Sequence, residues 1–425
     1  MKSSGKIDTR CVQAGYLPQN GEPRITPIVQ STTYQYGSAD EVADLFDLKA
    51  EGHMYSRISN PTVAVLESKI NALEGGVGAV ATASGQAAVT LAVLSLCSRG
   101  DNFIALSNLY GGTINLFTHT LKKIGIDVRF VDINAPLTSI VSKIDDRTKL
   151  VYGETIGNPG VEVLDIEQAA ALAHEHNLPL MIDSTFATPV LCRPFEFGAD
   201  IVMHSATKYL DGHATCVGGL LVDSGNFDWE KSGRFPEFVQ PDPSYHGLSY
   251  TQSFGNQAFI TRARTNYVRD IGFLMSPMNA FLINLGMETL HLRMQRHSQN
   301  ALHLAKFLED HPAVDWVAYP GLSSSPTYDL AQKYLPDGQG GILSFGLKGG
   351  LAAGKKFIDA LKLISLVVHV ADVRSHVLHP ASMTHRQLSD EQKKAAGIRP
   401  EQIRFSVGIE DVQDIEQDLE QALAG

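Results

Sequence analysis

Short apolar runs alternate with helical periodicity through the middle of the chain. The runs stand at 78–82, 102–106, 127–131, 150–154, 178–183 and 200–205. Between some of them, at 86–96 and 166–176, apolar residues recur at the spacing of an amphipathic helix. Parallel strands buried on both faces appear as nearly unbroken apolar runs. The pattern predicts an α/β fold with a mainly parallel sheet, whose ligands bind beyond the carboxyl ends of the strands.

The regions around this alternation divide the chain. Residues 1–60 combine turn-forming and polar residues with little periodicity, which predicts an N-terminal arm contacting a neighbouring subunit. Residues 61–288 are the predicted large domain, with a polar and aromatic excursion at 225–270. Excursions of that length are usually functional or disordered. Residues 289–425 contain helical and strand patterns that predict a smaller α+β domain.

Composition narrows the possible partners. A chain that is 44% hydrophobic and 19% charged has the balance of an ordinary globular protein. A net charge of -11 without a basic cluster argues against a nucleic-acid partner. The four cysteines lack a CxxC pair, which predicts neither disulfides nor a zinc site. There is no apolar run of membrane-spanning length and no signal-peptide pattern in MKSSGKIDTR, so we expect a cytoplasmic protein.

Two candidate catalytic residues follow apolar runs. Lys208 stands just past the run at 200–205, preceded by Ser205 and Thr207. It is either a hydrated loop lysine or a partly desolvated amine that forms an imine with a cofactor. Asp183 ends an earlier run and is either a turn residue or a carboxylate that keeps a pyridine nitrogen protonated. The sequence around each residue leaves both alternatives open.

Other strand ends carry candidate binding groups. The sequence SGQ at 84–86 opens a helix, where N–H groups could hold a phosphate or where Ser84 could be an ordinary N-cap. Tyr110 could stack on a planar cofactor or pack in the core. Glu154 and Asn158 follow the run at 150–154, and Asn158 could bind a cofactor hydroxyl or form a turn.

Together these residues resemble the Cys/Met metabolism family of pyridoxal phosphate enzymes, and the resemblance extends from about Thr9 to the end of the chain. The resemblance implies the aspartate aminotransferase-like fold, also called fold type I. That fold has a large domain with a mainly parallel seven-stranded sheet and a smaller α+β C-terminal domain. The motifs that carry the resemblance are YSRISNPT (55–62), ASGQAA (83–88), LYGGT (109–113), ETIGNP (154–159), IDSTFATP (182–189), SATKYLDGH (205–213), HPASMTH (379–385) and IRFSVGIE (403–410).

The family resemblance implies a role for each candidate. Lys208 would hold pyridoxal 5'-phosphate as a Schiff base, Asp183 would contact the ring nitrogen, and Tyr110 would stack on the ring and serve as an acid or base. Arg404 matches the arginine that binds the substrate α-carboxylate, a role that suits its planar fork. Glu154 and His369 are further expected substrate contacts. The remaining expected cofactor contacts are Ser84, Gly85, Gln86, Asn158, Ser205 and Thr207.

The resemblance also implies shared active sites. Tyr55 and Arg57 would reach the cofactor phosphate from a neighbouring subunit, so the active form is expected to be an oligomer. In this family, dimers that share active sites commonly pair into homotetramers. The N-terminal arm would then contribute directly to catalysis.

Within the family, the excursion at 225–270 resembles that of the O-acetylhomoserine sulfhydrylases, and Gly112 stands where typical methionine γ-lyases carry cysteine. The implied activity is a transferase reaction of methionine biosynthesis, in which O-acetyl-L-homoserine and sulfide give L-homocysteine and acetate. His369 and Ala371 depart from the resemblance, because the sulfhydrylases more often have Asn and Gly there and the γ-lyases Ser and Gly. The preferred acyl group and nucleophile therefore stay open.

Three other functions are alternatives. A γ-elimination enzyme such as a methionine γ-lyase would release a keto acid, ammonia and a thiol. A non-catalytic member would bind the cofactor without turnover. A nicotinamide enzyme is disfavoured because no GxGxxG follows the first predicted strand. No metal site is expected, since the histidines lack a recognised ligand spacing, namely His369, His376, His379 and His385.

Overall fold

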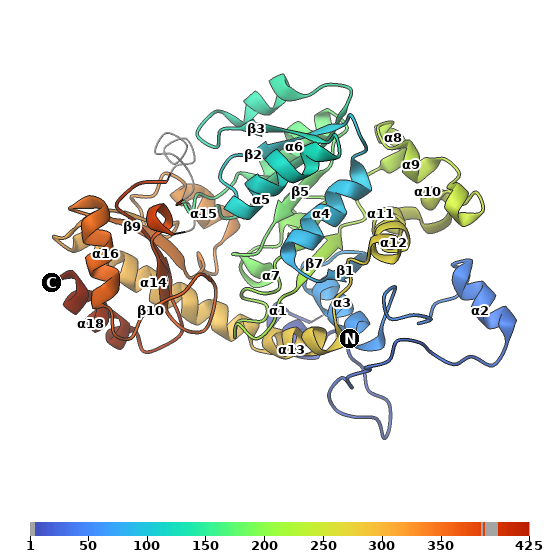
Figure 1. Ribbon diagram of the computed structural model, residues 1–425, viewed down its shortest axis with the longest axis horizontal. Helices are drawn as coiled ribbons and strands as arrows, with labels where there is room; N and C mark the ends of the chain where they lie inside the picture. Colours follow the sequence, from blue (N-terminus) through green and yellow to red (C-terminus); the bar gives the residue numbers. More distant parts are fainter. Residues whose placement is uncertain (1–4, 384–385, 387–397, 425) are drawn as a thin grey trace.

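A seven-stranded sheet forms the centre of the large domain in the computed structural model, which describes residues 5–383, 386 and 398–424 (Figure 1). The strand order is β1-β7-β6-β5-β4-β2-β3, and only β7 runs antiparallel to its neighbours. The predicted mainly parallel sheet is confirmed. The strands are β1 (Gly78–Thr82), β2 (Asn102–Leu106), β3 (Asp127–Val131), β4 (Thr148–Glu154), β5 (Leu180–Asp183), β6 (Ile201–His204) and β7 (Gly219–Asp223).

Helices bury both faces of this sheet, which explains the unbroken apolar runs. On one face Val80, Phe103 and Met203 pack with α4. On the other face, alternate strand residues such as Ile104 and Ile182 pack with α3 and α6. The helices of the large domain that flank the sheet are α3 (Pro61–Glu74), α4 (Gly85–Leu96), α5 (Gly111–Asn115), α6 (Ile166–Glu175), α7 (Thr188–Leu191) and α13 (Pro277–Glu288).

The excursion at 225–270 folds into short helices around its own aromatic cluster. The Trp229 ring stacks on Phe238 and Phe259, with centroids 4.6 and 5.5 Å away, and Phe235 meets it edge-on. All four side chains are buried. The helices are α8 (Trp229–Ser232), α9 (Pro236–Val239), α10 (Tyr250–Phe254), α11 (Ala258–Arg262) and α12 (Arg269–Ile271). The excursion is therefore an ordered part of the large domain.

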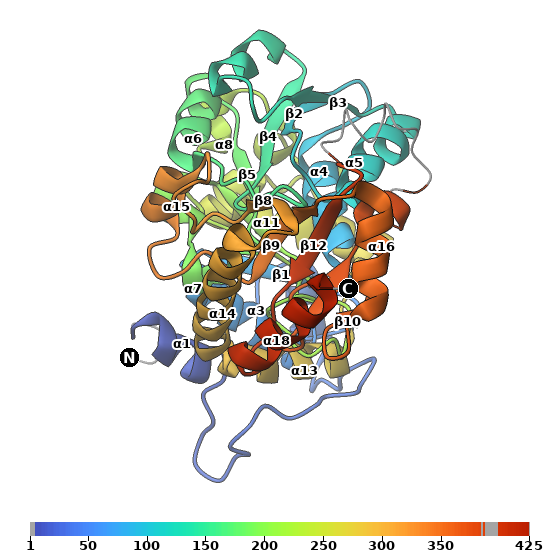
Figure 2. The same cartoon turned by 90° about the vertical axis from the view of Figure 1, so that its left-hand side faces the viewer.

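The C-terminal domain has a five-stranded sheet in the order β10-β11-β12-β9-β8 (Figure 2). Helices α14, α16 and α18 pack with this sheet around a core that includes Leu304, Phe345, Phe357 and Phe405. None of the helices that the structure describes is both long and apolar enough to span a membrane. The elements are β8 (Val314–Ala318), β9 (Ile342–Leu347), β10 (Ser365–Leu366), β11 (His376–Leu378), β12 (Gln402–Ser406), α14 (Leu290–Asp310), α15 (Tyr328–Tyr334), α16 (Gly350–Ala360) and α18 (Val412–Leu423).

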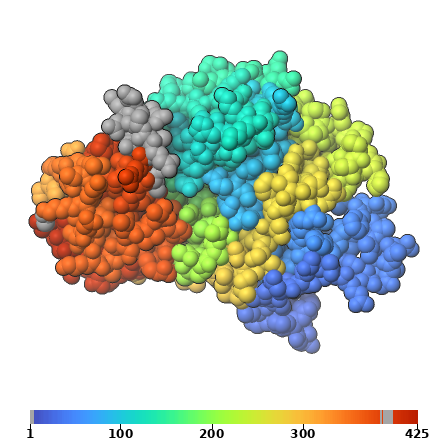
Figure 3. Space-filling model, in the orientation of Figure 1, coloured from blue at the N-terminus to red at the C-terminus, as the bar shows by residue number. Residues whose placement is uncertain are grey.

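The stretch between α1 and α3 lies at the end of the molecule opposite the C-terminal domain (Figure 3). Helix α1 (Ile7–Gln13) packs against α3, α13 and α14 through the buried side chain of Cys11. Beyond α1 the chain extends from the large domain and carries α2 (Ala39–Phe46) before it returns to α3. Much of this stretch is solvent-exposed in the single chain, including Leu17, Ile25 and Phe46.

Candidate active site

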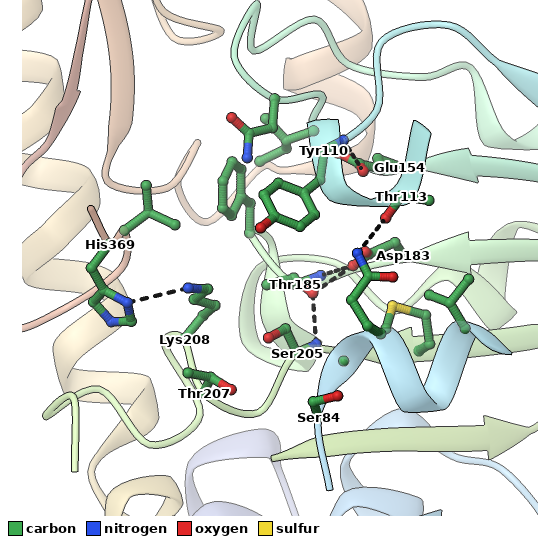
Figure 4. Close-up of a pocket in the computed structure, with 18 of the residues that line it drawn as sticks. Ser84, Tyr110, Thr113, Glu154, Asp183, Thr185, Ser205, Thr207, Lys208 and His369 are labelled. Carbon is green, nitrogen blue, oxygen red and sulfur yellow. Dashed lines mark hydrogen bonds between the residues drawn. The ribbon is translucent and has the colours of Figure 1, made fainter. Parts of the chain in front are cut away.

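A pocket of about 270 Å³ opens where the carboxyl ends of β4, β5 and β6 meet the start of α4 and a loop of the C-terminal domain. This is the edge of the sheet at which the sequence predicts ligand binding. Residues from six separate motifs converge there (Figure 4). The predicted site residues that line the pocket are Ser84, Gly85, Gln86, Tyr110, Glu154, Asn158, Asp183, Ser205, Thr207, Lys208, His369 and Arg404.

Lys208 extends into the pocket from the tight turn that follows β6. Its backbone N–H donates to the Ser205 carbonyl at 3.1 Å, which fixes the turn. Burial, together with the positive charge of Arg404, lowers the pKa of the Lys208 amine to about 8. Nζ also lies 3.2 Å from Nδ1 of His369. The amine is therefore desolvated enough to lose its proton near neutral pH, as imine formation requires.

Asp183 points into the same pocket from the end of β5. Its Oδ1 accepts hydrogen bonds from the backbone N–H of Thr185, at 3.0 Å, and from the Thr185 hydroxyl. Burial raises the pKa of the Asp183 carboxyl, although the two Thr185 hydrogen bonds lower it. A buried carboxylate of this kind is stabilised by a cationic partner, and a protonated pyridine nitrogen is one.

Glu154 lies beside Asp183 at the end of β4. Its Oε1 accepts a hydrogen bond from the backbone N–H of Tyr110 at 2.7 Å. Burial raises the pKa of Glu154 well above its ordinary value, and the Asp183 charge raises it further. The hydrogen bond fixes the backbone of Tyr110, the residue just before α5, and so places the Tyr110 ring at the pocket.

The start of α4 forms the anion-binding end of the pocket. Ser84 caps the helix by accepting from the Ala87 N–H at 3.1 Å, while the first helical N–H groups have no acceptor within the helix. A Cβ added to Gly85 would lie 2.7 Å from Cβ of Ser205, so only glycine permits this close approach. Figure 4 shows Ser84, Ser205 and Thr207 together at this end of the pocket.

Gln86 and Tyr110 also line the pocket. Oε1 of Gln86 is buried and has no hydrogen-bond partner among the described residues. The Tyr110 side chain is half-exposed, with its ring toward the cavity. A free amide oxygen and an exposed aromatic face suit a planar ligand that also carries polar groups. With an amine, a carboxylate and an anion site in place, the pocket fits pyridoxal phosphate.

Arg404 enters the pocket from β12 of the C-terminal domain. Its guanidinium donates to Oδ1 of Asn158 at 3.3 Å and to the carbonyl of His369 at 3.2 Å. Burial lowers the pKa of Arg404 to about 10, so it is still cationic at neutral pH. No carboxylate of the described residues pairs with it within 4.0 Å, which leaves its charge available to an anionic group of a substrate.

Tyr55 and Arg57 do not line the pocket of their own chain. The Arg57 guanidinium lies 5.3 Å from the centroid of the Tyr55 ring, and Tyr55 is exposed. Both residues follow the extended N-terminal stretch and precede α3. In one chain they are therefore separate from the other predicted cofactor contacts.

Sequence reasoning missed Thr185. Its hydroxyl donates to Asp183 and accepts from the Ser205 N–H at 2.8 Å, so it links the ends of β5 and β6. The signal was present in IDST, where a hydroxyl residue follows the aspartate by two positions, the spacing of an Asx turn. Thr185 thus fixes the end of β5, which carries Asp183, relative to the end of β6, which leads to Lys208.

His369, His376 and His379 lie in the part of the chain that the structure describes, and they do not form a metal cluster. Among residues 5–383, 386 and 398–424, no three His, Cys, Asp or Glu side chains are placed to bind a metal ion. His379 bonds Ser382 and the Pro400 carbonyl. Thr384 and His385, the end of the HPASMTH motif, lie outside the described residues.

Comparisons with known proteins extend over nearly the whole chain. The sequence model of the family "Cys/Met metabolism PLP-dependent enzyme" matches residues 8–424. The chain is 47% identical to the homocysteine synthase of Schizosaccharomyces pombe, over 99% of this chain and 98% of that protein. It is also 47% identical to O-acetyl-L-homoserine sulfhydrylase 1 of Thermus thermophilus, over 99% of this chain and all of the relative (100%).

A solved structure has the same fold. A Campylobacter jejuni protein described as an O-acetylhomoserine (thiol)-lyase superposes with a TM-score of 0.96 and 37% identity. The match covers 99% of this chain and 100% of that one. That structure contains N'-pyridoxyl-lysine-5'-monophosphate.

Proposed function

Because the chain belongs to the family of Cys/Met metabolism PLP-dependent enzymes, we propose that it replaces the acetyl ester of O-acetyl-L-homoserine with sulfide, giving L-homocysteine and acetate. The observation that carries this proposal is the convergence of Lys208, Asp183 and Arg404 in one pocket of a chain so similar to homocysteine synthases. A transferase acting on an amino acid ester needs an imine-forming amine, an electron-withdrawing cofactor and a carboxylate-binding group.

Each of these residues has a distinct task. Bound pyridoxal phosphate supplies an electron sink for charge that develops on the substrate α-carbon. Nζ of Lys208 takes the α-proton, and the low pKa of this amine, about 8, lets it accept and release protons near neutral pH. Arg404 orients the substrate by its α-carboxylate. Asp183 keeps a proton on the ring nitrogen.

Tyr110 is the proposed acid or base at the leaving group. Its half-exposed ring faces the cavity, whereas its backbone is held by Glu154. Acetate leaves the γ-carbon once the α- and β-protons have been removed, and sulfide then adds to the γ-carbon. A phenolic hydroxyl near that carbon can donate or accept the proton involved.

Gly112 favours sulfide addition over γ-elimination. A Cβ at this position would lie 2.5 Å from Cε1 of Tyr110 and 2.8 Å from Nε2 of Gln86. A cysteine here, as in typical methionine γ-lyases, would therefore require the Tyr110 ring and the Gln86 amide to move from their observed positions. The placement of the ring depends on the glycine.

The proposal includes an oligomer with shared sites. Residues 1–60 would form an arm on a neighbouring subunit, 61–288 the cofactor-binding domain and 289–425 the C-terminal domain. Tyr55 and Arg57 would complete the phosphate site of that neighbour, in dimers that pair into a homotetramer. Exposed apolar residues of the N-terminal stretch support such a contact. A cytoplasmic location is supported by four cysteines that are all free thiols.

Product identification tests the proposed reaction. Purified protein with bound cofactor is incubated with O-acetylhomoserine plus sulfide, and separately with methionine alone. We expect homocysteine and acetate from the first mixture and little keto acid from the second. Rapid keto acid release from methionine without homocysteine synthesis would identify a γ-lyase, and no turnover of either would identify a non-catalytic cofactor-binding protein. Parallel reactions with O-succinylhomoserine or methanethiol establish the acyl group and the sulfur donor.

A further inference from the structure

His369 contacts two key groups of the pocket at once. Its Nδ1 lies 3.2 Å from Nζ of Lys208 (Figure 4). Its backbone carbonyl accepts a hydrogen bond from Nη2 of Arg404 at 3.2 Å. The lysine belongs to the large domain, whereas His369 and Arg404 come from the C-terminal domain. His369 therefore stands between the amine and the carboxylate-binding guanidinium.

The loop that carries His369 is firmly held. Ala371 has a left-handed backbone, with φ 66°, and its N–H donates to the Ser406 hydroxyl at 2.8 Å. The Val373 N–H donates to the carbonyl of Gly212, which belongs to the Lys208 loop, at 2.9 Å. These bonds tie the two loops together and fix the distance between lysine and histidine.

The imidazole of His369 is also held by packing. Its ring lies parallel to that of His376, with centroids 5.9 Å apart and an interplanar angle of 23°. Because the ring has few alternative orientations, Nδ1 is presented to Lys208 in advance of any reaction. A group held in this way directs its partner at little entropic cost.

The ring is neutral at physiological pH. Burial, with smaller contributions from the charges of Lys208 and His376, lowers the pKa of His369 to about 4 although Asp372 and Asp211 oppose the shift. A neutral imidazole carries a lone pair on one nitrogen, so Nδ1 can accept a hydrogen bond from Nζ. A protonated imidazole would instead repel both Lys208 and Arg404.

We propose that His369 is a positioning residue that accepts a hydrogen bond from Nζ of Lys208 whenever this amine is free of the cofactor, and so directs it toward the reacting carbon. This inference rests on the role proposed for Lys208. The side chain of His369 acts on the lysine, whereas only its backbone acts on Arg404. Changing the side chain therefore alters the chemistry of Lys208 and spares carboxylate binding.

The test titrates Nζ directly in protein from which the cofactor has been removed. Pyridoxal phosphate is added at a series of pH values, and the rate at which visible absorption returns gives the apparent pKa of the amine. His369→Phe keeps a ring but removes the acceptor, and His369→Asn keeps an acceptor. His303→Phe is the matched control, because it makes the same change at an exposed histidine of α14 that does not line the pocket.

In His369→Phe we expect the apparent pKa of Nζ to fall by about half a unit to one unit, since the ammonium form loses its acceptor. His369→Asn and His303→Phe should stay near the wild-type value. With substrate, kcat of His369→Phe should drop about tenfold, the effect of one hydrogen bond to a charged group, with little change in KM for the amino acid.

An unchanged Nζ titration in His369→Phe would overturn the inference, as would an equal shift in His369→Phe and His369→Asn. If His369→Phe does not fold, His369→Leu provides the same comparison. The titration needs only pyridoxal phosphate, so a protein that fails to convert O-acetylhomoserine would refute the proposed function without affecting this result.

Discussion

Glu154 and Asp183 pair in parallel register at the ends of β4 and β5, so the buried carboxyl of Glu154 and the partly buried carboxyl of Asp183 lie side by side beneath the pocket. The pKa of each is raised by burial, and the Asp183 charge raises that of Glu154 further. Two adjacent carboxylates are not both ionised without cost. A cation bound next to Asp183 would relieve this repulsion, which links the strand register to the binding of a protonated ring.

Asp183→Asn tests that link. The amide cannot stabilise a positive ring nitrogen, so we expect kcat to fall on the order of 100-fold while Lys208 still binds the cofactor. Absorption spectra show whether the cofactor is retained, and steady-state kinetics give kcat. Asp183→Glu keeps the charge and should retain more activity than Asp183→Asn, so equal losses in both variants would contradict a charge-based role.

Arg404→Lys tests recognition of the substrate carboxylate. Lysine keeps the charge but cannot make the bidentate contact, and we expect KM for the amino acid to rise about 10- to 100-fold. KM for sulfide should change little, because sulfide has no carboxylate. A selective rise in KM for sulfide would place Arg404 at the nucleophile instead.

Mixed oligomers test whether subunits share sites. Arg57→Ala and Lys208→Ala should each be impaired alone, but hybrid dimers contain one complete site if Arg57 serves the partner. Random re-association should then restore about a quarter of the wild-type activity, since half of the dimers are hybrids with one intact site. Failure of the mixture to regain activity, with hybrid formation shown by mass spectrometry, would argue against shared sites.

Asp223 predicts a pH dependence of stability. It is fully buried in β7, Oδ2 has no partner among the described residues, and burial raises its pKa from 3.8 to about 7. Between these values the folded state binds more protons than the unfolded state, so this residue makes stability fall as pH rises from about 4 to 7.

Asp223→Asn should remove that dependence. Above pH 7, the ionised Asp223 lowers the free energy of unfolding by on the order of 4 kcal/mol at most. Urea unfolding of wild type and variant across this pH range measures the difference. Asp315→Asn is the control, because Asp315 is exposed on β8 and its loss should leave the pH dependence intact. Parallel curves for wild type and Asp223→Asn would contradict the argument.

Local sequence patterns predicted much of the fold. The runs at 78–82, 102–106 and 127–131 coincide with β1, β2 and β3, because buried parallel strands need uninterrupted apolar residues. Strand β7 was not recognised, since its apolar part is only Leu220–Val222 between glycines and an aspartate. The helical periodicity at 166–176 corresponds to α6, which ends one residue earlier, at Glu175.

The sequence motifs identified most of the residues that line the pocket, but they did not predict which of these residues contact one another. The hydrogen bond from Lys208 to His369 joins residues 161 positions apart, and that from Arg404 to Asn158 spans 246. Neither can be read from a local pattern, because each depends on how the two domains meet. The aromatic cluster around Trp229 was missed for a related reason, since the rings come from separate short helices.

Reductive trapping of the cofactor tests the central claim most directly. Borohydride converts a Schiff base on lysine into a stable secondary amine, which peptide mapping by mass spectrometry can locate. We predict that the pyridoxyl group of the reduced protein lies on Lys208 alone. A pyridoxyl group on another lysine, or none after incubation with pyridoxal phosphate, would contradict the account.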